Sequence, residues 1–243
     1  MRVQVRQDLF LANDVEKEIK NKSRLKVFIT PCYDRYSIAN VPPTILSIFQ
    51  AKAQGCERLP KNIIDEHSDG VHKIVLLIVD SMGYKQFFNC YPKDRALKIV
   101  ADNSNLIPIT STFPSTTTTA LTTLSTGATP REHGIIGYTM YLKGYGFVVN
   151  MIDFAPAYDY KWGTLLEMGL DPKDFLGLKT IYEILNEEGI KTHAIMRFKD
   201  SGLSKMNLND AKISTYVNSS DLFVTLRRLL EDEDDEEAYF CAY

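Results

Sequence analysis

The stretch IVLLIVDSMGY, residues 74–84, decides the expected fold. Its first six residues form a continuous run of β-branched residues and leucine, which is typical of a strand buried on both faces of a parallel sheet. Shorter runs of the same kind follow at residues 106–110, 191–196 and 238–243, with helical patterns between them. Strands that alternate with helices predict an α/β fold with a mostly parallel central sheet flanked by helices.

The segments between these strands carry helix and turn patterns. Helices are expected at residues 36–53, 83–102, 180–188 and 221–230 (capped by Ser219 or Ser220), and in the threonine-rich run that ends at Gly127. Residues 138–142 and 147–152 flank a glycine-rich turn and predict a hairpin. Residues 1–70, with a candidate strand at 25–30, are expected to be connecting and edge material, and residues 71–243 to be the core of a single domain.

The composition is that of an ordinary folded protein, with 44% hydrophobic residues, 24% charged residues and a formal net charge of −3 in 243 residues. No apolar run approaches the roughly 18 residues that span a bilayer. The slightly acidic balance gives no footprint for a nucleic-acid polymer or a membrane surface. The four cysteines form no CxxC pair, so we expect no disulfide framework and a reducing, cytoplasmic location.

The last residues, AYFCAY, have the pattern of a buried strand and directly follow the acidic run EDEDDEE. A chain seldom ends on such a strand without a polar tail. We therefore expect the domain to be truncated at its C-terminus, with part of the functional unit missing.

Asp80 is the first residue beyond the apolar strand. An open parallel sheet places its ligand site beyond the carboxyl ends of its strands, so the carboxylate of Asp80 is expected at that edge. The alternative is that Asp80 only caps the following helix, with Ser81 and Gly83 shaping the turn.

The stretch ITSTFPSTTTTALTTLSTGATPREHGIIGY, residues 109–138, is crowded with threonine. A hydroxyl in the first turn of a helix faces unpaired backbone N–H groups and the positive end of the helix dipole, which together suit a phosphoryl group. Such a hydroxyl becomes a nucleophile when a metal or a base takes its proton, and Asp80 is a candidate to hold such a metal. The alternative is that these threonines are N-caps and back-bonded helix residues.

Together, the two stretches resemble the metal-binding and nucleophile segments of the alkaline phosphatase superfamily, most closely those of the type I phosphodiesterase/nucleotide pyrophosphatase family. In that family an apolar strand ends in the first metal-ligating Asp. A Thr or Ser nucleophile follows on a helix that closes with TG and then P-x-x-HGI. The matching residues here are Asp80, Thr126–Gly127 and PREHGI at 130–135. Residues 36–49, YSIANVPPTILSIF, also resemble an N-terminal segment of bacterial and archaeal members.

The resemblance selects a nucleophile among three threonines. The family places it ten residues before the glycine of TG and sixteen before the histidine of HGI, and both counts lead to Thr117. A rival alignment through the words Thr-Phe-Pro selects Thr112 but requires an insertion within the helix. Thr116 is the nearest fallback.

Two departures from the family pattern stand out. Tyr138 occupies the position of an asparagine that helps to hold the phosphoryl oxygens, so nucleotide specificity does not carry over, although Tyr138 can still donate one hydrogen bond to substrate. The Asp-x-x-x-His pair, the Asp-His pair and the final His that complete two metal sites have no counterpart among the four histidines, and His133 reads as a structural turn residue.

The resemblance implies a metal-dependent hydrolase of phosphate esters that acts through a covalent phospho-threonine. Thr117 would be the nucleophile, Asp80 and Thr117 would ligate metal, and the cofactors would be two divalent ions, zinc by resemblance. The partner would be a small phosphate ester, with the oligomeric state left open. The alternatives are a phosphonate or phosphomonoester hydrolase of the same superfamily, or an inactive fragment or binding module.

Overall fold

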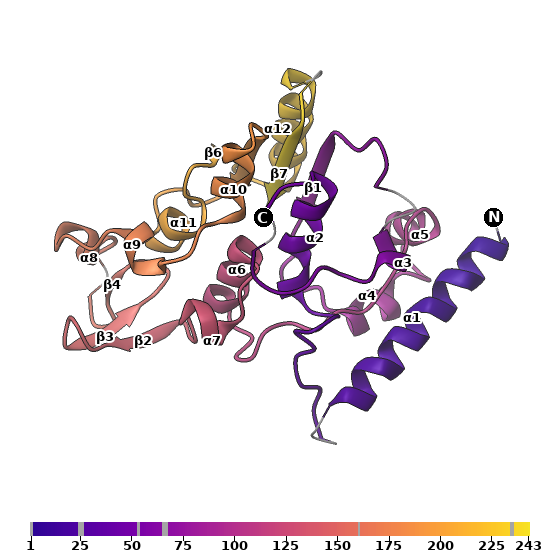
Figure 1. Cartoon of the computed structure of the whole chain (residues 1–243), viewed down its shortest axis with the longest axis horizontal. Helices are drawn as coiled ribbons and strands as arrows, with labels where there is room; N and C mark the ends of the chain where they lie inside the picture. Colours follow the sequence, from indigo (N-terminus) through magenta and orange to yellow (C-terminus); the bar gives the residue numbers. More distant parts are fainter. Residues whose placement is uncertain (1, 24–26, 53, 65–67, 160, 234–235) are drawn as a thin grey trace.

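The computed structural model describes residues 2–23, 27–52, 54–64, 68–159, 161–233 and 236–243, with side chains from residue 11 onward. Its central sheet has four parallel strands in the order β1 (Lys73–Leu77), β7 (Ala238–Ala242), β5 (Lys191–Met196) and β6 (Lys212–Thr215). Helices flank this sheet (Figure 1). The predicted α/β fold with a parallel central sheet is therefore confirmed, and β6 is a strand that the sequence patterns did not predict.

The remaining elements lie around the central sheet. The predicted hairpin is confirmed as β2 and β3 and belongs to a three-stranded antiparallel sheet at the opposite end of the molecule from α1 (Figure 1). Its strands are β2 (Thr139–Leu142), β3 (Phe147–Asn150) and β4 (Ala155–Pro156). The helices are α1 (Arg2–Lys22), η1 (Ile38–Asn40), α2 (Val41–Ile48), α3 (Lys61–Ile64), α4 (Tyr84–Cys90), α5 (Arg95–Asp102), α6 (Thr117–Thr126), α7 (Pro130–His133), α8 (Thr164–Glu167), α9 (Pro172–Leu176), α10 (Ile181–Glu187), α11 (Gly202–Asn207) and α12 (Ser219–Asp232).

The side chains of β7 alternate between the two faces of the sheet, as the pleat of a strand requires. Tyr239 and Cys241 pack with α2 and α10 in one apolar cluster, whereas Phe240 packs against α12 on the opposite face. All five residues of β7 are buried, because helices cover both faces and strands flank both edges. This strand is the centre of the core.

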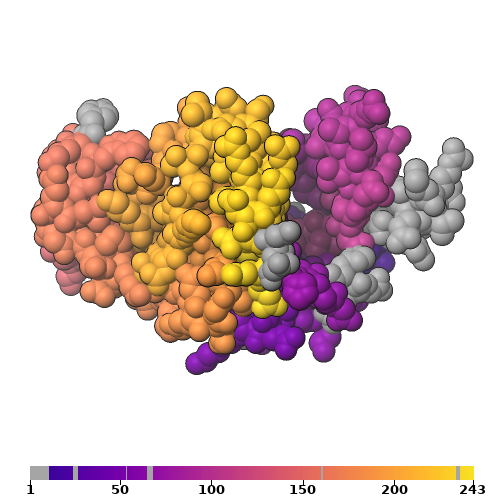
Figure 2. All heavy atoms as spheres, turned by 90° about the horizontal axis from the view of Figure 1, so that it is seen from above, coloured from indigo at the N-terminus to yellow at the C-terminus, as the bar shows by residue number. Residues whose placement is uncertain are grey.

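β1 is covered on one face only. Ile74 and Leu76 pack against the cluster formed by α2 and α10, but Val75, Leu77 and Val79 are 39%, 42% and 56% exposed. The prediction that this strand is buried on both faces is wrong, because no helix in the described part of the chain packs on its second face. Figure 2 shows a hollow on this side, between the α12–β7 region and the segment of α4 and α5.

The first seventy residues hold more structure than the sequence reading predicted. α1 has 21 residues, and its Ala12, Val15 and Ile19 are buried. Their spacing places them on one helix face, where Val15 and Ile19 pack in a cluster with Cys32, Tyr36 and Ile63. The sequence patterns did not predict this helix, because a majority of polar side chains concealed a narrow apolar stripe.

Three local predictions also need correction. Residues 106–110 form no strand, although Thr110 makes an isolated bridge with Ser37; Pro108 removes a ladder donor there. The expected helix at 83–102 is divided into α4 and α5 at Pro92, which cannot continue a helix. Of the candidate strand at 25–30, residues 25 and 26 lie outside the described residues, and residues 27–30 form no strand.

Candidate active site

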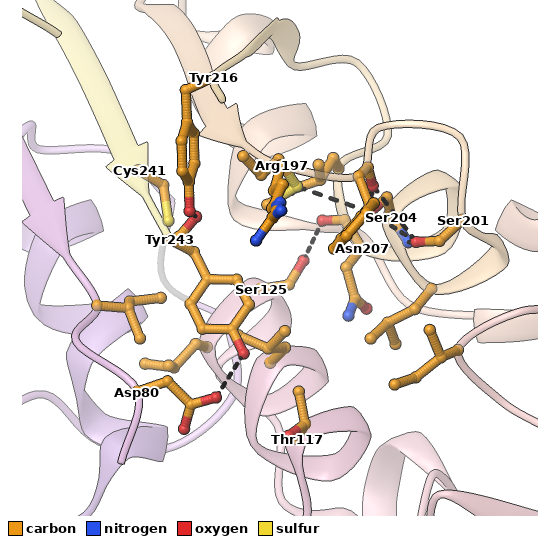
Figure 3. Close-up of a pocket in the computed structure, with 18 of the residues that line it drawn as sticks. Asp80, Thr117, Ser125, Arg197, Ser201, Ser204, Asn207, Tyr216, Cys241 and Tyr243 are labelled. Atoms are coloured by element: carbon orange, nitrogen blue, oxygen red, sulfur yellow. Dashed lines mark hydrogen bonds between the residues drawn. The ribbon is translucent and has the colours of Figure 1, made fainter. Parts of the chain in front are cut away.

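The carboxyl ends of the four parallel strands meet at one edge of the sheet, as in other open α/β sheets. Asp80 follows β1, Tyr243 follows β7, Arg197 follows β5 and Tyr216 follows β6. All four side chains line one cavity of about 810 Å³, part of which is drawn in Figure 3. The topology of the sheet therefore brings together residues that are up to 163 positions apart in the sequence.

α6 brings Thr117 to the same cavity. Thr116 is the N-cap residue, with extended dihedral angles (φ −98°, ψ 156°), and Thr117 is the first helical residue. The Thr116 side chain accepts no hydrogen bond from the backbone N–H groups in the first turn of α6, and no other described side chain does so. These unpaired donors and the helix dipole leave the start of α6 suited to an anion.

The other two candidate threonines are placed differently. The Thr112 side chain is 3% exposed, and its hydroxyl donates to the carbonyl oxygen of Pro114 at 2.9 Å. The Thr116 hydroxyl is engaged with the hydroxyls of Thr118 and Thr119, at 3.1 and 2.9 Å. Of these three candidates only Thr117 is among the described residues that line the cavity.

Asp80 and Tyr243 are joined directly. The Tyr243 hydroxyl donates to Oδ2 of Asp80 at 2.9 Å, and the Ser81 backbone N–H donates to Oδ1 at 2.7 Å. Burial, as the main cause, and the hydrogen bond to Asp80, as the second, raise the pKa of Tyr243 to about 12. A hydrogen bond with the Thr117 side chain acts to lower this pKa. The phenol of Tyr243 therefore lies between the candidate metal ligand and the candidate nucleophile.

The backbone beside Asp80 is strained. Ser81 has φ 63°, in the left-handed region that non-glycine residues seldom occupy. In this conformation the Ser81 N–H donates a hydrogen bond to the carboxylate of Asp80. Strain of this kind collects at functional positions, where the surrounding structure enforces it. The alternative that Asp80 caps α4 is wrong, because the carboxylate bonds Ser81 and Tyr243, and Gln86 accepts from the Gly83 N–H instead.

The family motif TG and HGI anchors α6 from its far end. Gly127 ends the helix with φ 71°, and its carbonyl oxygen accepts from the Cys56 N–H at 2.9 Å. His133 is 5% exposed; its Nδ1 accepts from the Ile135 N–H and its Nε2 lies 3.0 Å from the Thr123 hydroxyl. Burial lowers the pKa of His133 to about 4, so the ring is neutral and structural, as its turn position predicted.

Other lining residues give the cavity apolar walls and a few polar points. Tyr138 lines the cavity and is 47% exposed. Asp153 also lines it; burial raises the pKa of Asp153, and Asn150 donates to its carboxylate at 2.7 Å. Trp162 and Phe198 contribute aromatic surface in a T-shaped contact with ring centroids 6.1 Å apart. The arrangement suits a ligand with an extended apolar part.

The described residues supply only part of the ligand set of a two-metal centre. No group of three or more His, Cys, Asp or Glu side chains in the described residues is placed to hold a metal ion. His133 and His193 are both used elsewhere, the latter in a 3.0 Å contact with Glu233. Asp80 offers one carboxylate beside the Thr117 hydroxyl, which is less than the three or four protein ligands that hold a zinc ion.

Sequence reasoning missed Tyr243, Arg197, Tyr216 and Asn207 as cavity residues. The rule that placed Asp80 at the carboxyl edge applies equally to Arg197, because the strand before it was predicted to end at Met196. Tyr216 carried no such signal, since β6 was not predicted. Asn207 reaches the cavity only through the packing of α11, which no local pattern reveals.

Comparison with known protein families gives a match over most of the chain. Residues 74–237 match the family model described as type I phosphodiesterase / nucleotide pyrophosphatase. The match spans more than half of the chain, so the chain belongs to this family and to the alkaline phosphatase superfamily. No curated protein and no solved structure matches the chain. Within the described residues, no helix combines the length and apolarity needed to cross a membrane.

Proposed function

We propose that the chain acts on small phosphate esters at the cavity edge formed by Asp80 and Thr117, with Thr117 as the nucleophile. Family membership supports phosphodiesterase-type or nucleotide pyrophosphatase-type hydrolysis. The observation that carries the assignment to Thr117 is its position at the start of α6, where it lines the same cavity as Asp80 and lies beside unpaired first-turn N–H groups.

In this proposal, Oγ1 of Thr117 loses its proton and bonds to phosphorus, and the bond from phosphorus to the leaving oxygen breaks. The proton lost by Thr117 passes to solvent, and the leaving oxygen takes up a proton and departs as an alcohol. Water then hydrolyses the phospho-threonine, which releases a phosphate or a monoester and restores the Thr117 hydroxyl. The first-turn N–H groups of α6 stabilise the charge that develops on the phosphoryl oxygens. Tyr138, on the cavity wall, donates one hydrogen bond to substrate.

The family resemblance adds two divalent ions, zinc in this proposal, with Asp80 and Thr117 among their ligands. Because the described residues hold only part of such a ligand set, no step is assigned to a metal. For the same reason the expected turnover by the 243-residue chain is slow.

The test is the release of p-nitrophenolate from bis-p-nitrophenyl phosphate by the full chain, with and without added Zn²⁺. Thr117→Ala is expected to abolish release, whereas Thr112→Val and Thr116→Ala are expected to retain it. Acid quenching during turnover, followed by mass spectrometry, should locate a phosphoryl group on Thr117. Unchanged release by Thr117→Ala would refute the assignment.

A second candidate is a module that binds phosphate esters without cleaving them, which the incomplete ligand set favours. Under this reading, wild type and Thr117→Ala bind phenyl phosphate equally and neither becomes phosphorylated. The mass measurement on Thr117 therefore separates the two candidates.

A further inference from the structure

The cavity extends from Asp80 and Thr117 to a second polar region that the proposed chemistry does not use. In Figure 3, Arg197 and Asn207 lie on either side of Ser125, whereas Asp80 and Thr117 lie at the other end of the view. The cavity is otherwise lined largely by apolar side chains, among them Leu121, Leu124, Leu203 and Leu208.

The side chain of Asn207 points to a ligand. The residue is 4% exposed, and neither Nδ2 nor Oδ1 has a hydrogen-bond partner among the described residues. Its backbone carbonyl oxygen is satisfied by the hydroxyl of Ser125, so the unpaired groups are confined to the amide that lies on the cavity wall. A buried donor and acceptor without partners destabilise a fold, and native proteins keep them rarely and for a reason.

Arg197 supplies a positive charge at the same wall. Arg197 is exposed, and no carboxylate pairs with it in the described part of the chain. The other charged residues that line the cavity are Asp80 and Asp153, so Arg197 is the one cation among the described lining residues. Its guanidinium lies 5.4 Å from the centroid of the Phe198 ring, which supports the planar group while leaving its N–H donors free.

Local packing links Arg197 to Asn207. The Ser204 hydroxyl on α11 donates to the carbonyl oxygen of Phe198 at 2.6 Å and lies 3.6 Å from the sulfur of Met196, so it holds the two neighbours of Arg197. Asn207 follows Ser204 by three residues on the same helix, which places the two on one helix face. The backbone that carries Arg197 is therefore held against the helix that carries Asn207.

We propose that Arg197 and Asn207 form a second anion-binding subsite, which takes a carboxylate or phosphate group on the same substrate whose ester is processed at Thr117. This inference rests on the proposed function and narrows its substrate class to phosphate esters that carry a further acidic group beyond an apolar spacer. The guanidinium fork matches the two oxygens of such a group, and Nδ2 of Asn207 adds a third donor.

The experiment uses Trp162, the single tryptophan of the chain, because it lines this cavity and its fluorescence reports occupancy. The full chain is titrated at neutral pH with 4-carboxyphenylphosphonate and with 4-carbamoylphenylphosphonate. In the second compound an uncharged amide replaces the carboxylate, and the phosphonate is kept. Neither probe has an ester bond to hydrolyse. The carboxylate is expected to bind about tenfold more tightly, in line with one charge-assisted pair that is partly open to water. Benzene-1,4-diphosphonate, as a third probe, distinguishes a phosphate-type group from a carboxylate.

Three variants and one control sharpen the test. Arg197→Gln and Asn207→Leu are expected to remove the preference for the acidic probes, and Asn207→Ser repeats the test with a smaller polar side chain. Lys199→Gln is the matched control, because Lys199 lies on the same loop, is exposed and is not among the lining residues; it should keep the preference. Equal binding of the first two probes by wild type, or an undiminished preference in Arg197→Gln, would overturn the proposal.

The binding measurement tests the subsite independently of hydrolysis at Thr117. A chain that prefers the acidic probes but never phosphorylates Thr117 supports the subsite and refutes the proposed hydrolysis. A chain that is phosphorylated on Thr117 but binds the two probes equally does the reverse.

Discussion

β7 and β1 are neighbours in one sheet, yet they are packed very differently. Every residue of β7 is buried, whereas Val75 and Leu77 of β1, and Val79 beyond its end, are exposed to solvent. The helices repeat this contrast, since six of the ten residues of α6 are buried and α4 and α5 bury none. The firmly packed region carries Thr117 and the loosely packed region carries Asp80, so the candidate site lies across the boundary between them.

Hydrogen bonds from threonine hydroxyls to the helix backbone explain how the threonine-rich α6 can be buried. The Thr122 hydroxyl donates to the carbonyl oxygen of Thr118 and the Thr126 hydroxyl to that of Thr122, both at 2.8 Å. Such back-bonding satisfies the hydroxyl groups inside the helix. The alternative that these threonines are back-bonded residues therefore holds for Thr122 and Thr126, but not for Thr117 at the cavity.

The largest expected difference between the two strands is in the cost of truncating a side chain. Phe240→Ala in β7 should lower the free energy of unfolding by about 3–5 kcal/mol, because the ring is fully buried and stacks on His193 with centroids 5.0 Å apart. Val75→Ala in β1 should cost less than about 1 kcal/mol, since Val75 is 39% exposed. Urea unfolding measures both. Similar losses for the two variants would mean that β1 is covered in solution.

The second difference appears on acidification of the firmly packed region. His133 has a folded-state pKa of about 4, against its usual 6.5, because burial disfavours the charged ring. A lowered pKa contributes stability above pH 6.5 that is lost as the pH falls towards 4, here up to about 3 kcal/mol at about 1.4 kcal/mol for each pKa unit. A proton on Nδ1 would also face the Ile135 N–H donor.

Unfolding measured between pH 7 and pH 4 for wild type and His133→Gln tests this expectation. The variant should lose less stability over that range. His72→Gln is the control, because the His72 side chain is 72% exposed. Parallel pH profiles for wild type and His133→Gln would contradict the assignment of a neutral, buried ring.

The sequence predicted the firmly packed region better than the loosely packed one. β5, β7, α6 and α10 arise from local patterns that tertiary contacts reinforce. The predictions for β1, α4 and α1 went wrong on burial or continuity, since a continuous apolar run does not reveal which neighbour covers it. The three residues predicted for the site, Asp80, Thr117 and Tyr138, all line one cavity. Tyr243 and Asn207 could not be predicted, because their positions depend on register and helix packing.

A helix-capping residue is present in each of the two regions. Thr180 caps α10, where its hydroxyl accepts from the Glu183 N–H at 3.3 Å, and it is fully buried. Asp94 caps α5, accepting from the Leu97 N–H at 2.9 Å, on a helix without buried residues. Thr180→Ala should lower the free energy of unfolding by about 1–2 kcal/mol. Asp94→Ala should leave it nearly unchanged and instead speed hydrogen exchange within α5. A global loss in Asp94→Ala comparable to that in Thr180→Ala would show that α5 unfolds together with the core.

The smallest expected effect concerns the bond that joins the two regions. Tyr243→Phe removes the 2.9 Å hydrogen bond from β7's end to Asp80, and should cost about 0.5 kcal/mol, because a bond near the surface contributes little. The pKa of Tyr243 is raised from its usual 10.0 to about 12. The protonated phenol therefore contributes stability that is complete below pH 10 and is lost as the pH rises towards 12. The variant should lack this alkaline loss, whereas Tyr141→Phe, at a 63% exposed position, should keep it.

Hydrogen exchange of the backbone N–H groups at residues 78–82 tests what the bond between Tyr243 and Asp80 does. If Tyr243 ties the loose strand to the packed core, exchange there quickens in Tyr243→Phe while β5 stays protected. Unchanged exchange at residues 78–82 would mean that Asp80 is held by the turn at Ser81 alone.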